Sequence, residues 1–419
     1  MEDNNQNYID PDYVDPSLLA QYDEPEPDYT KVSPHNIGGT PKTPSYNLQT
    51  SGNGSKLDQI FEYAINMDAS DIHLLSGCQP LVRISKELLP IDALEELTPE
   101  DMDEFIKQIT GNKEKLIELL DEQRLLDLNY KYNTTRFRVN ISFSMDVPTI
   151  TMRLIKDQLP PYDSLNLPPI IKEFAVKSQG LILVTGKPGS GKSTTLSSLV
   201  NEINENENKK ILMLENPIEY VHANKRSVIV QKEISPYGDC RSFHEGVVNS
   251  LREDCDVLVI GEIRDKVTMD AAIEMAETGH LVLGTIHTNS CSETIDRIIN
   301  FYQTEDQQTI KFMLANSLRL IVSQRMLRGG YGNLVMIPEI LVVDDQIGGM
   351  IKKDKFNSVE VEDAMQSGRE RGNYALVFSL ADAVLAGKIT MEQAYREVDF
   401  KRQELLSRIV AAGRQRKYY

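Results

Sequence analysis

A glycine-rich segment contains the residues with the clearest chemistry in this sequence. Residues 186–193 read Gly-Lys-Pro-Gly-Ser-Gly-Lys-Ser, which fits the phosphate-binding pattern G-x-x-x-x-G-K-[ST]. The glycines let backbone N–H groups turn toward a phosphate, while the Lys192 ammonium reaches its outer oxygens and the Ser193 hydroxyl ligates Mg²⁺. A helix starting here would add its dipole. The predicted nucleotide-binding residues are Gly186, Lys187, Pro188, Gly189, Ser190, Gly191, Lys192, Ser193 and Thr194.

Two acidic residues follow apolar runs and are candidates to act beside that loop. Glu262 comes after Val257–Ile260, and a carboxylate at the end of such a strand lies beside a loop-bound Mg²⁺. Glu219 follows Ile211–Leu214 and could orient or deprotonate an attacking water. Either acid could instead be a surface residue at a solvated turn or a helix cap. We predict Ser193 and Glu262 as metal ligands and Glu219 as a catalytic residue.

Two histidines bracket another apolar run. His280 and His287 stand at either end of Leu281–Ile286. No third ligand is spaced to complete a transition-metal site with them, and Mg²⁺ prefers oxygen ligands. The residues alone leave two interpretations open, which are a hydrogen-bonding role near the terminal phosphate and an ordinary structural role.

The elements that must position these side chains alternate between strands and helices. Such alternation predicts an α/β fold with a mostly parallel sheet covered by helices on both faces. We place this second domain at residues 170–419. Its predicted strands are Leu181–Val184, Ile211–Leu214, Val257–Ile260 and Leu281–Ile286, and its C-terminal region is predicted to be a helical appendage with helices near 307–325, 359–366, 376–386 and 391–409.

An α+β domain is predicted over residues 55–157. Thr98 and Asp101 have the spacing of a helix capping box, and Asn133-Thr134 joins two extended runs. A proline-rich stretch, 158–169, suits an extended linker to the second domain. The expected strands of the first domain are 72–75, 81–84, 125–132 and 136–143.

Composition narrows the function class. Residues 1–54 are acidic, rich in proline and poor in aliphatic side chains, which predicts a disordered tail. The formal net charge of −18 argues against a general nucleic-acid binder. The four cysteines are scattered singly, which favours a reducing cytoplasm over a disulfide framework or a zinc site. No apolar run approaches the ~18 residues of a membrane span.

The ordered motifs of this chain resemble the PilT family of type IV pilus motor ATPases, within the wider secretion-superfamily ATPases. The resemblance covers about residues 56–400. The loop at 186–193 corresponds to the Walker A motif. The other matching segments are Ala69–Leu74, Leu81–Ile84, Arg136–Asn140 and Thr151–Leu154 for the N-terminal domain, then Leu214–His222 for the Asp box, Gln231–Ile234, Leu251–Asp265 for the Walker B motif and Ala276–Asn289 for the His box.

The resemblance implies a homohexameric motor of two-domain subunits, each with a PAS-like N-terminal domain and a RecA-like P-loop domain. ATP would lie between the N-terminal domain of one subunit and the P-loop domain of the next. Glu219 then corresponds to the Asp-box glutamate, Glu262 to the Walker B glutamate, and His280 and His287 to the His box. The family works at the cytoplasmic face of the inner membrane on a pilus platform protein, in some systems beside a paralogous motor ATPase.

Arginines supplied across such an interface would neutralise charge on the transferring phosphoryl group. Our candidates are Arg138 and Arg153, with Arg252 and Arg264 in reserve. The alternative is that these arginines form surface or inter-domain salt bridges.

Two departures from the family pattern bear on function. The Asp box has Asn216 where aspartate is usual, and Gly348, Gly349 and Lys353 replace the Arg-Asn pair and the Glu of a C-terminal motif in retraction motors. The chain also lacks the four-cysteine insert of assembly motors. The missing insert favours a retraction motor, which is the function that we expect. Two alternatives stay open: a motor for a related secretion or competence system, and a non-hydrolysing accessory subunit.

Overall fold

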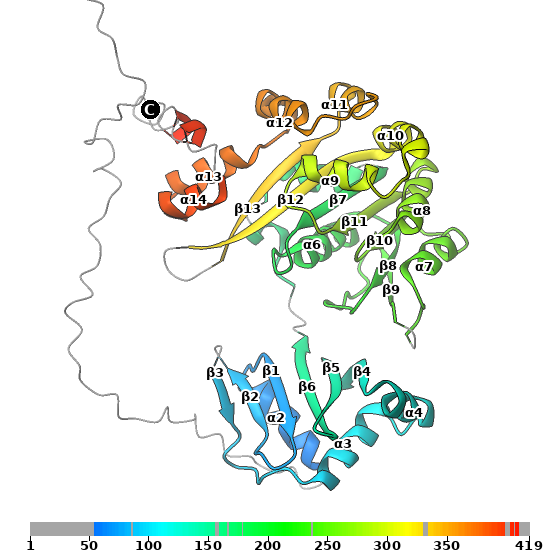
Figure 1. Cartoon of the computed structure of the whole chain (residues 1–419), viewed down its shortest axis with the longest axis vertical. Coiled ribbons are helices and arrows are strands. Elements are labelled where there is room, and N and C mark those ends of the chain that lie inside the picture. The colour runs from blue at the N-terminus through cyan, green and yellow to red at the C-terminus, as the bar shows by residue number, and fades with distance from the viewer. Residues whose placement is uncertain are drawn as a thin grey trace, which may run out of the picture. The chain divides into compact units, whose positions relative to one another are not determined.

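The computed structural model describes residues 54–84, 87–155, 159–165, 167–177, 179–235, 238–329, 334–398, 403–405 and 407–409. The predicted disordered tail lies outside these residues, apart from Gly54. The described strands form two separate sheets, one of six strands and one of seven (Figure 1). In the described part of the chain, none of the helices is both long enough and apolar enough to cross a membrane.

The six-stranded sheet, which we call the N-terminal sheet, is antiparallel with the order β3-β2-β1-β6-β5-β4. Along β5 the side chains of Phe137 and Val139 are buried and Arg138 between them is exposed, as the two-residue repeat of a strand requires. The mixture of helices and strands agrees with the prediction for this region. Its elements are α2 (Lys56–Asn66), β1 (Asp71–Leu75), β2 (Leu81–Ile84), β3 (Glu87–Pro90), α3 (Pro99–Thr110), α4 (Glu114–Gln123), β4 (Leu125–Tyr132), β5 (Thr135–Ser144) and β6 (Val147–Ile155).

The seven-stranded sheet has the order β13-β12-β7-β11-β10-β8-β9. All neighbouring pairs are parallel except β12 with β13. Its strands are β7 (Gly180–Gly186), β8 (Lys210–Glu215), β9 (Val228–Glu233), β10 (Val257–Ile260), β11 (Leu281–Ile286), β12 (Leu318–Arg328) and β13 (Leu334–Val342). Its α-helices are α5 (Pro169–Lys177), α6 (Lys192–Asn206), α7 (Phe243–Ser250), α8 (Lys266–Glu277), α9 (Cys291–Ile299), α10 (Thr304–Ser317), α11 (Asp345–Ile351), α12 (Ser358–Ser367), α13 (Leu376–Leu385) and α14 (Met391–Val398).

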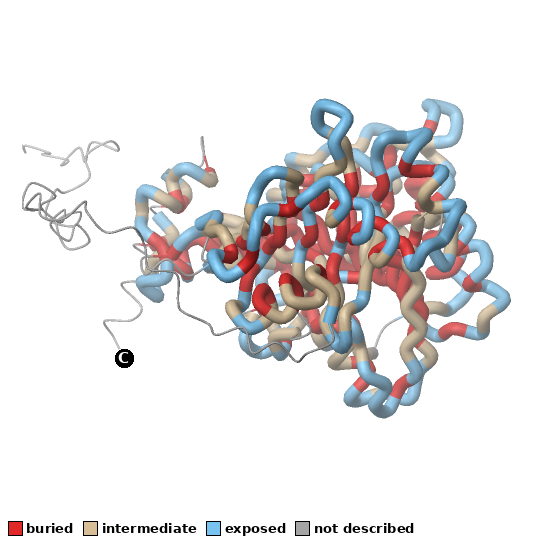
Figure 2. Tube along the Cα trace, turned by 90° about the horizontal axis from the view of Figure 1, so that it is seen from below, coloured by how far each residue is buried: buried red, intermediate tan, exposed pale blue. Residues whose placement is uncertain are grey.

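Helices cover both faces of this sheet, as predicted. In β7, Leu181 and Leu183 pack into the core formed with α8, α9 and α10, while Ile182 and Val184 pack into the core formed with α5 and α6. The strands read as continuous apolar runs because both faces are buried. In Figure 2 the buried positions gather in the interior and the exposed ones on the outer loops.

The prediction of a helix over 307–325 is wrong in its second half. Helix α10 ends at Ser317, and Leu318–Arg328 forms β12 beside β7 and β13. The middle of β12 is buried on both faces, so its apolar residues do not alternate and their spacing resembles that of a buried helix. The C-terminal region is therefore not a purely helical appendage, because β12 and β13 complete the sheet.

The predicted linker packs onto the second sheet rather than running extended through solvent. Tyr162 is buried in a one-turn 3₁₀ helix, Tyr162–Leu165, and joins the core on the α6 side together with Leu167. The Tyr162 hydroxyl donates to the Pro168 carbonyl over 3.0 Å, and the Ser198 hydroxyl of α6 donates to the Pro160 carbonyl over 3.0 Å. These contacts fix the segment against α6.

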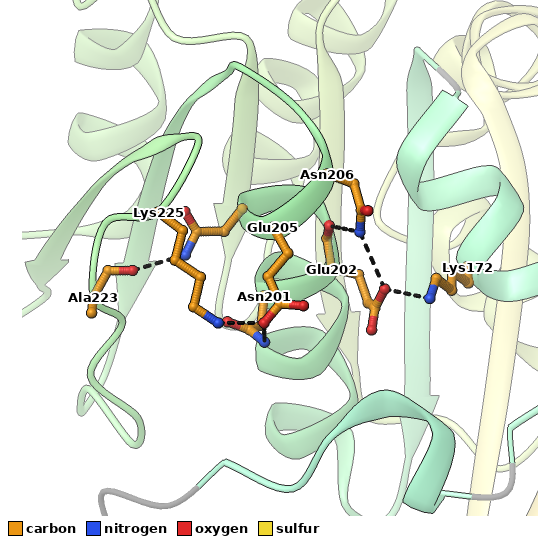
Figure 3. Close-up of polar contacts among 8 residues, drawn as sticks. Lys172, Asn201, Glu202, Glu205, Asn206, Ala223 and Lys225 are labelled. Atoms are coloured by element: carbon orange, nitrogen blue, oxygen red, sulfur yellow. Dashed lines mark hydrogen bonds and ion pairs between the residues drawn. The ribbon is translucent and has the colours of Figure 1, made fainter.

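The last turns of α6 hold a loop that follows β8 (Figure 3). Asn204 is fully buried; its amide donates to the Ala223 carbonyl over 2.8 Å and accepts from the Lys225 N–H over 3.0 Å. An exposed ion pair joins Lys225 to Glu205, and a half-buried one joins Lys172 of α5 to Glu202. These contacts hold the C-terminal turns of α6 to α5 and to the loop after β8.

Replacing Asn204 by alanine should destabilise the protein more than replacing its exposed neighbour. The Asn204→Ala change removes two half-buried hydrogen bonds made by a fully buried side chain, so we expect the free energy of unfolding to fall by ~1–3 kcal/mol. Asn206→Ala, at an exposed position of the same helix, should change it by less than ~0.5 kcal/mol. Denaturant unfolding of both variants measures the difference, and equal losses would contradict the role assigned to Asn204.

Candidate functional site

The predicted phosphate loop lies at one edge of the seven-stranded sheet, where its parallel strands end. Residues 187–191 connect the end of β7 to the start of α6. Strands β8, β10 and β11 run parallel to β7 and end at the same edge with Glu215, Ile260 and Ile286. This edge of an open parallel sheet is where such folds bind ligands.

Glycine is required at two positions of the loop. Gly186 has φ +145°, and a Cβ there would lie 2.4 Å from the Ser190 hydroxyl oxygen and 2.5 Å from the Gln324 carbonyl. Gly191, which caps the N-terminus of α6, has φ +86°. Side chains at these positions would be strained and would push the loop out of shape. The tight turn leaves the first N–H groups of α6 without partners inside the helix, ready for an anion.

Lys192 places a buried cation inside this loop. Lys192 is only 8% exposed. Its ammonium group donates to the carbonyls of Gly186 over 2.9 Å and Lys187 over 3.2 Å. Burial lowers the pKa of Lys192, and the negative charges of Glu262 and Glu219 oppose that shift. The site therefore combines a poorly solvated cation with two nearby carboxylates.

His287 joins Lys192 to Glu262. The His287 Nδ1 lies 3.2 Å from the Lys192 ammonium, and its Nε2 lies 3.0 Å from Glu262 Oε1. The other oxygen of Glu262 accepts from the exposed Arg264 guanidinium. The structure thus brings together three of the residues that the sequence predicted, Lys192, Glu262 and His287, and it adds Arg264 from the reserve candidates.

Glu219 contacts the first turn of α6. The Ser193 hydroxyl donates to Glu219 Oε1 over 3.0 Å, and the hydroxyls of Thr194 and Tyr220 lie 3.0 Å apart. Glu219 itself is exposed. The predicted metal ligand Ser193 and the predicted catalytic carboxylate of Glu219 are therefore direct neighbours at the mouth of the loop.

The donors at this edge suit Mg²⁺ better than a transition metal. Ser193 and Glu262 offer a hydroxyl and a carboxylate. No cluster of three or more His, Cys, Asp or Glu residues that could hold a metal exists among the described residues. Mg²⁺ is held in nucleotide sites by one or two side chains together with phosphate oxygens and water. The residues present fit that ion.

His280 lies at the opposite edge of the sheet. It precedes β11, whereas His287 follows it, and six residues of strand at ~3.3 Å each separate the two edges by ~20 Å. The His280 Nδ1 lies 3.1 Å from the Met275 carbonyl and 3.0 Å from the Thr278 hydroxyl. Its ring lines a cavity of about 420 Å³ with Asp256 and Lys209. The structure does not bring His280 together with the phosphate loop of its own chain.

The candidate arginines Arg138 and Arg153 lie side by side in the N-terminal sheet. They face each other across β5 and β6, both exposed, and Arg153 faces Asp71 of β1. The Arg153 Nε lies 2.9 Å from one Asp71 oxygen, and the Arg83 Nε lies 3.9 Å from the other. Asp71 is buried, and its salt bridges and hydrogen bonds outweigh desolvation and lower its pKa. Arg252, the other reserve candidate, is exposed beyond α7.

The site also contains a residue that sequence reasoning did not single out. Glu215 ends β8 and is 8% exposed. Burial raises its pKa to about 7; the charge of Glu219 adds to the shift, and hydrogen bonds from Gln231 and the Glu219 backbone oppose it. Its position directly after an apolar strand, like that of Glu262, is a signal that could have identified it.

The positions that depart from the family pattern are tolerant of other side chains. Asn216 is exposed. A Cβ on Gly348 would meet nothing closer than the Ala315 carbonyl at 3.7 Å, and one on Gly349 would meet nothing within 4 Å. Lys353 forms an exposed ion pair with Glu360. Packing therefore does not explain why glycine occupies 348 and 349.

Known proteins resemble this chain over most of its length. The family model described as "Type II/IV secretion system protein" matches residues 54–396. The "Twitching motility protein" of Neisseria gonorrhoeae is 33% identical, covering 77% of this chain and 85% of its own length. The "Type IV pilus retractation ATPase PilT" of Pseudomonas aeruginosa is 31% identical, covering 81% and 96%. A crystal structure of "the Pilus Retraction Motor PilT and Bound ADP" is 34% identical with a TM-score of 0.76, covering 83% and 98%.

The burial of Glu215 makes stability depend on pH in a defined direction. Its pKa is about 7 in the folded chain against an ordinary value of 4.5, so at a pH between these two pKa values the folded state binds more protons. The free energy of unfolding then falls as pH rises through that window, by at most ~3 kcal/mol. We expect Glu215→Gln to gain stability relative to the wild type between pH 5 and pH 8 in thermal melts. The exposed Glu277→Gln serves as control, and parallel curves for all three proteins would contradict the assignment.

Proposed function

The chain belongs to the type II/IV secretion system protein family and is a PilT-like ATPase, and from this premise we propose that it is a hexameric motor that couples Mg-ATP hydrolysis to type IV pilus retraction. The observation that carries the proposal is the joint placement of Lys192, Ser193, Glu219, Glu262 and His287 at the end of the phosphate loop. We infer the cargo, a type IV pilus, from the relatives that are named for twitching motility and pilus retraction.

Each side chain has a role that follows from its contacts. The loop N–H groups and Lys192 bind the phosphates, and low solvation strengthens that attraction. Ser193 and Glu262 would hold Mg²⁺, which when bound would neutralise charge on the phosphate oxygens. Glu219 orients a water and accepts its proton, because its carboxylate lies beside Ser193 at the mouth of the loop. His287 contacts both Glu262 and Lys192 and so fixes their positions relative to each other.

A hexamer would account for the exposure of the arginines. Arg138 and Arg153 project from the N-terminal sheet with a buried carboxylate, Asp71, to hold Arg153 in place. In a ring they would reach the nucleotide of an adjacent subunit and neutralise the charge that develops during phosphoryl transfer. His280, at the far edge of the sheet, would face a neighbouring subunit rather than its own nucleotide. We also propose that the N-terminal domain has a PAS-like fold.

We assign the motor to the cytoplasmic face of the inner membrane, where it would drive a pilus platform protein, with a paralogous motor ATPase as a further partner. Nucleic acid is not among its proposed partners, because the net charge of −18 repels a phosphate backbone.

The second candidate is a non-hydrolysing accessory subunit of a paralogous pilus motor. Asn216 in the Asp box favours it, since an acid that is usual in the family is missing there. The gathered Lys192, Ser193, Glu219 and Glu262 oppose it, because a subunit that only binds nucleotide does not need a carboxylate at the water position. A motor for a related secretion system shares this chemistry and differs only in cargo.

Phosphate release from Mg-ATP distinguishes the motor from the accessory subunit. The wild-type chain should turn over, and Glu219→Gln should lower kcat by ~10²–10³-fold because the water loses its base. Binding of a fluorescent ATP analogue should stay within ~3-fold of the wild type, since Glu219 does not hold the phosphates. A wild type that binds ATP but releases no more phosphate than Glu219→Gln would favour the accessory subunit.

Mixing two inactive variants tests the arginine assignment. Arg153→Ala removes the charge supplied to a neighbour, and Lys192→Ala removes the cation of the subunit's own loop. If Arg153 acts across the interface, each variant alone is inactive and an equimolar mixture regains activity at roughly a quarter of its sites. Arg153→Ala mixed with itself after the same treatment is the control. Wild-type turnover by Arg153→Ala, or no recovery in the mixture, would argue against Arg153 as a finger.

A further inference from the structure

We propose that Gln231 of β9 is a positioning residue for Glu219, acting through the segment between β8 and β9 that carries this carboxylate. The inference rests on the proposed function, because it assigns how the water-activating group of that same site is held. Glu219 is exposed and lies outside any helix or strand, so its place depends on how the backbone around it is anchored.

The Gln231 amide makes three hydrogen bonds to residues flanking Glu219. Its Nε2 donates to Glu215 Oε2 over 2.9 Å and to the Tyr220 carbonyl over 2.7 Å. Its Oε1 accepts from the His222 N–H over 3.0 Å. One side chain therefore holds the segment on both sides of Glu219.

Glu215 transmits this hold to Glu219 itself. The Glu215 carboxyl accepts a hydrogen bond from the backbone N–H of Glu219 and another from the Gln231 amide. Glu215 is buried at the end of β8, where hydrogen bonds are stronger than in water. The path from Gln231 to Glu219 thus runs through the buried Glu215 carboxyl.

The opposite side of the segment is held by helix α6. Ser193 contacts the Glu219 carboxylate, and Thr194 contacts the Tyr220 hydroxyl. Glu219 consequently lies between the first turn of the phosphate-loop helix and the β9 amide. Loss of the β9 anchor would remove the bonds to the Tyr220 carbonyl and the His222 N–H, and the carboxylate could then shift away from the water position.

Only an amide satisfies the pattern of groups around position 231. Two acceptors, the Glu215 carboxyl and the Tyr220 carbonyl, face its nitrogen, and one donor, the His222 N–H, faces its oxygen. A carboxylate at 231 would keep the bond from His222 but would face both acceptors with no hydrogen to donate. A methionine has similar length and shape but makes none of the three bonds.

The first experiment compares kcat with nucleotide affinity. Gln231→Met and Gln231→Glu should both lower kcat for phosphate release by ~10–100-fold, while the dissociation constant of a fluorescent ATP analogue stays within ~3-fold. Lys225→Met is the matched control, because it removes an exposed ion pair with Glu205 at the end of the same segment; its kcat should match the wild type. Unchanged kcat in the Gln231 variants, or ATP affinity falling in step with kcat, would overturn the proposal.

The second experiment separates positioning from general stability. In single-turnover assays, adding Gln231→Met to Glu219→Gln should lower the rate no further, because Gln231 acts only through the Glu219 carboxylate. A multiplicative loss in the double variant would overturn the proposal. If Gln231→Met does not fold, the shorter amide of Gln231→Asn replaces it with the same expectation. Absence of wild-type turnover is a different outcome, since it removes the proposed function on which this inference depends.

Discussion

The buried ammonium of Lys192 is the constraint on which the site depends. A cation with so little access to water must be balanced by nearby dipoles and charges. The structure supplies carbonyls from the turn after β7, the His287 ring from the end of β11, and the carboxylates of Glu262 and Glu219 from two further segments. Moving any of these segments would leave the cation less well balanced, so the loop, the acids and the histidine form one unit.

That unit exists because four parallel strands end at one edge. Each strand is buried on both faces, which requires helices on both sides and places Lys192, Glu219, Glu262 and His287 beyond the strand ends. The alternation within β7 directs Leu183 to one core and Val184 to the other, and the chain then turns at Gly186 into the loop. Packing and catalysis are therefore separated along the strand, with apolar residues inside and reactive ones at the tip.

Sequence reasoning succeeded where the chemistry is local. The phosphate loop, the Thr98 capping box of α3 and the turn at Asn133 between β4 and β5 each depend on a few adjacent residues, and all are present. It failed where the answer depends on contacts far along the chain. The residues of β12 are buried on both faces, so their pattern did not distinguish a strand from a helix.

Gln231 shows the same limit at the level of one side chain. It lies opposite Met213 in the parallel pairing of β8 with β9, and this register brings its amide to Glu215, two residues further along β8. A shift of the pairing by one residue would turn the side chain to the other face of the sheet. The residues Gln231–Ile234 alone do not predict such a contact, because the acceptors come from β8 and from the segment between β8 and β9.

The same network bears on the missing acid of the Asp box. Asn216 occupies an exposed position, whereas Glu215, the buried acid beside it, keeps its bonds to Gln231 and to the Glu219 backbone. An exposed carboxylate interacts weakly with distant charges because water and salt screen it, while a buried anchor fixes geometry. Replacing aspartate by asparagine at 216 therefore removes a screened charge and leaves intact the contacts that place Glu219 beside Ser193. For that reason we expect the departure to tune the rate of the proposed reaction rather than to abolish it.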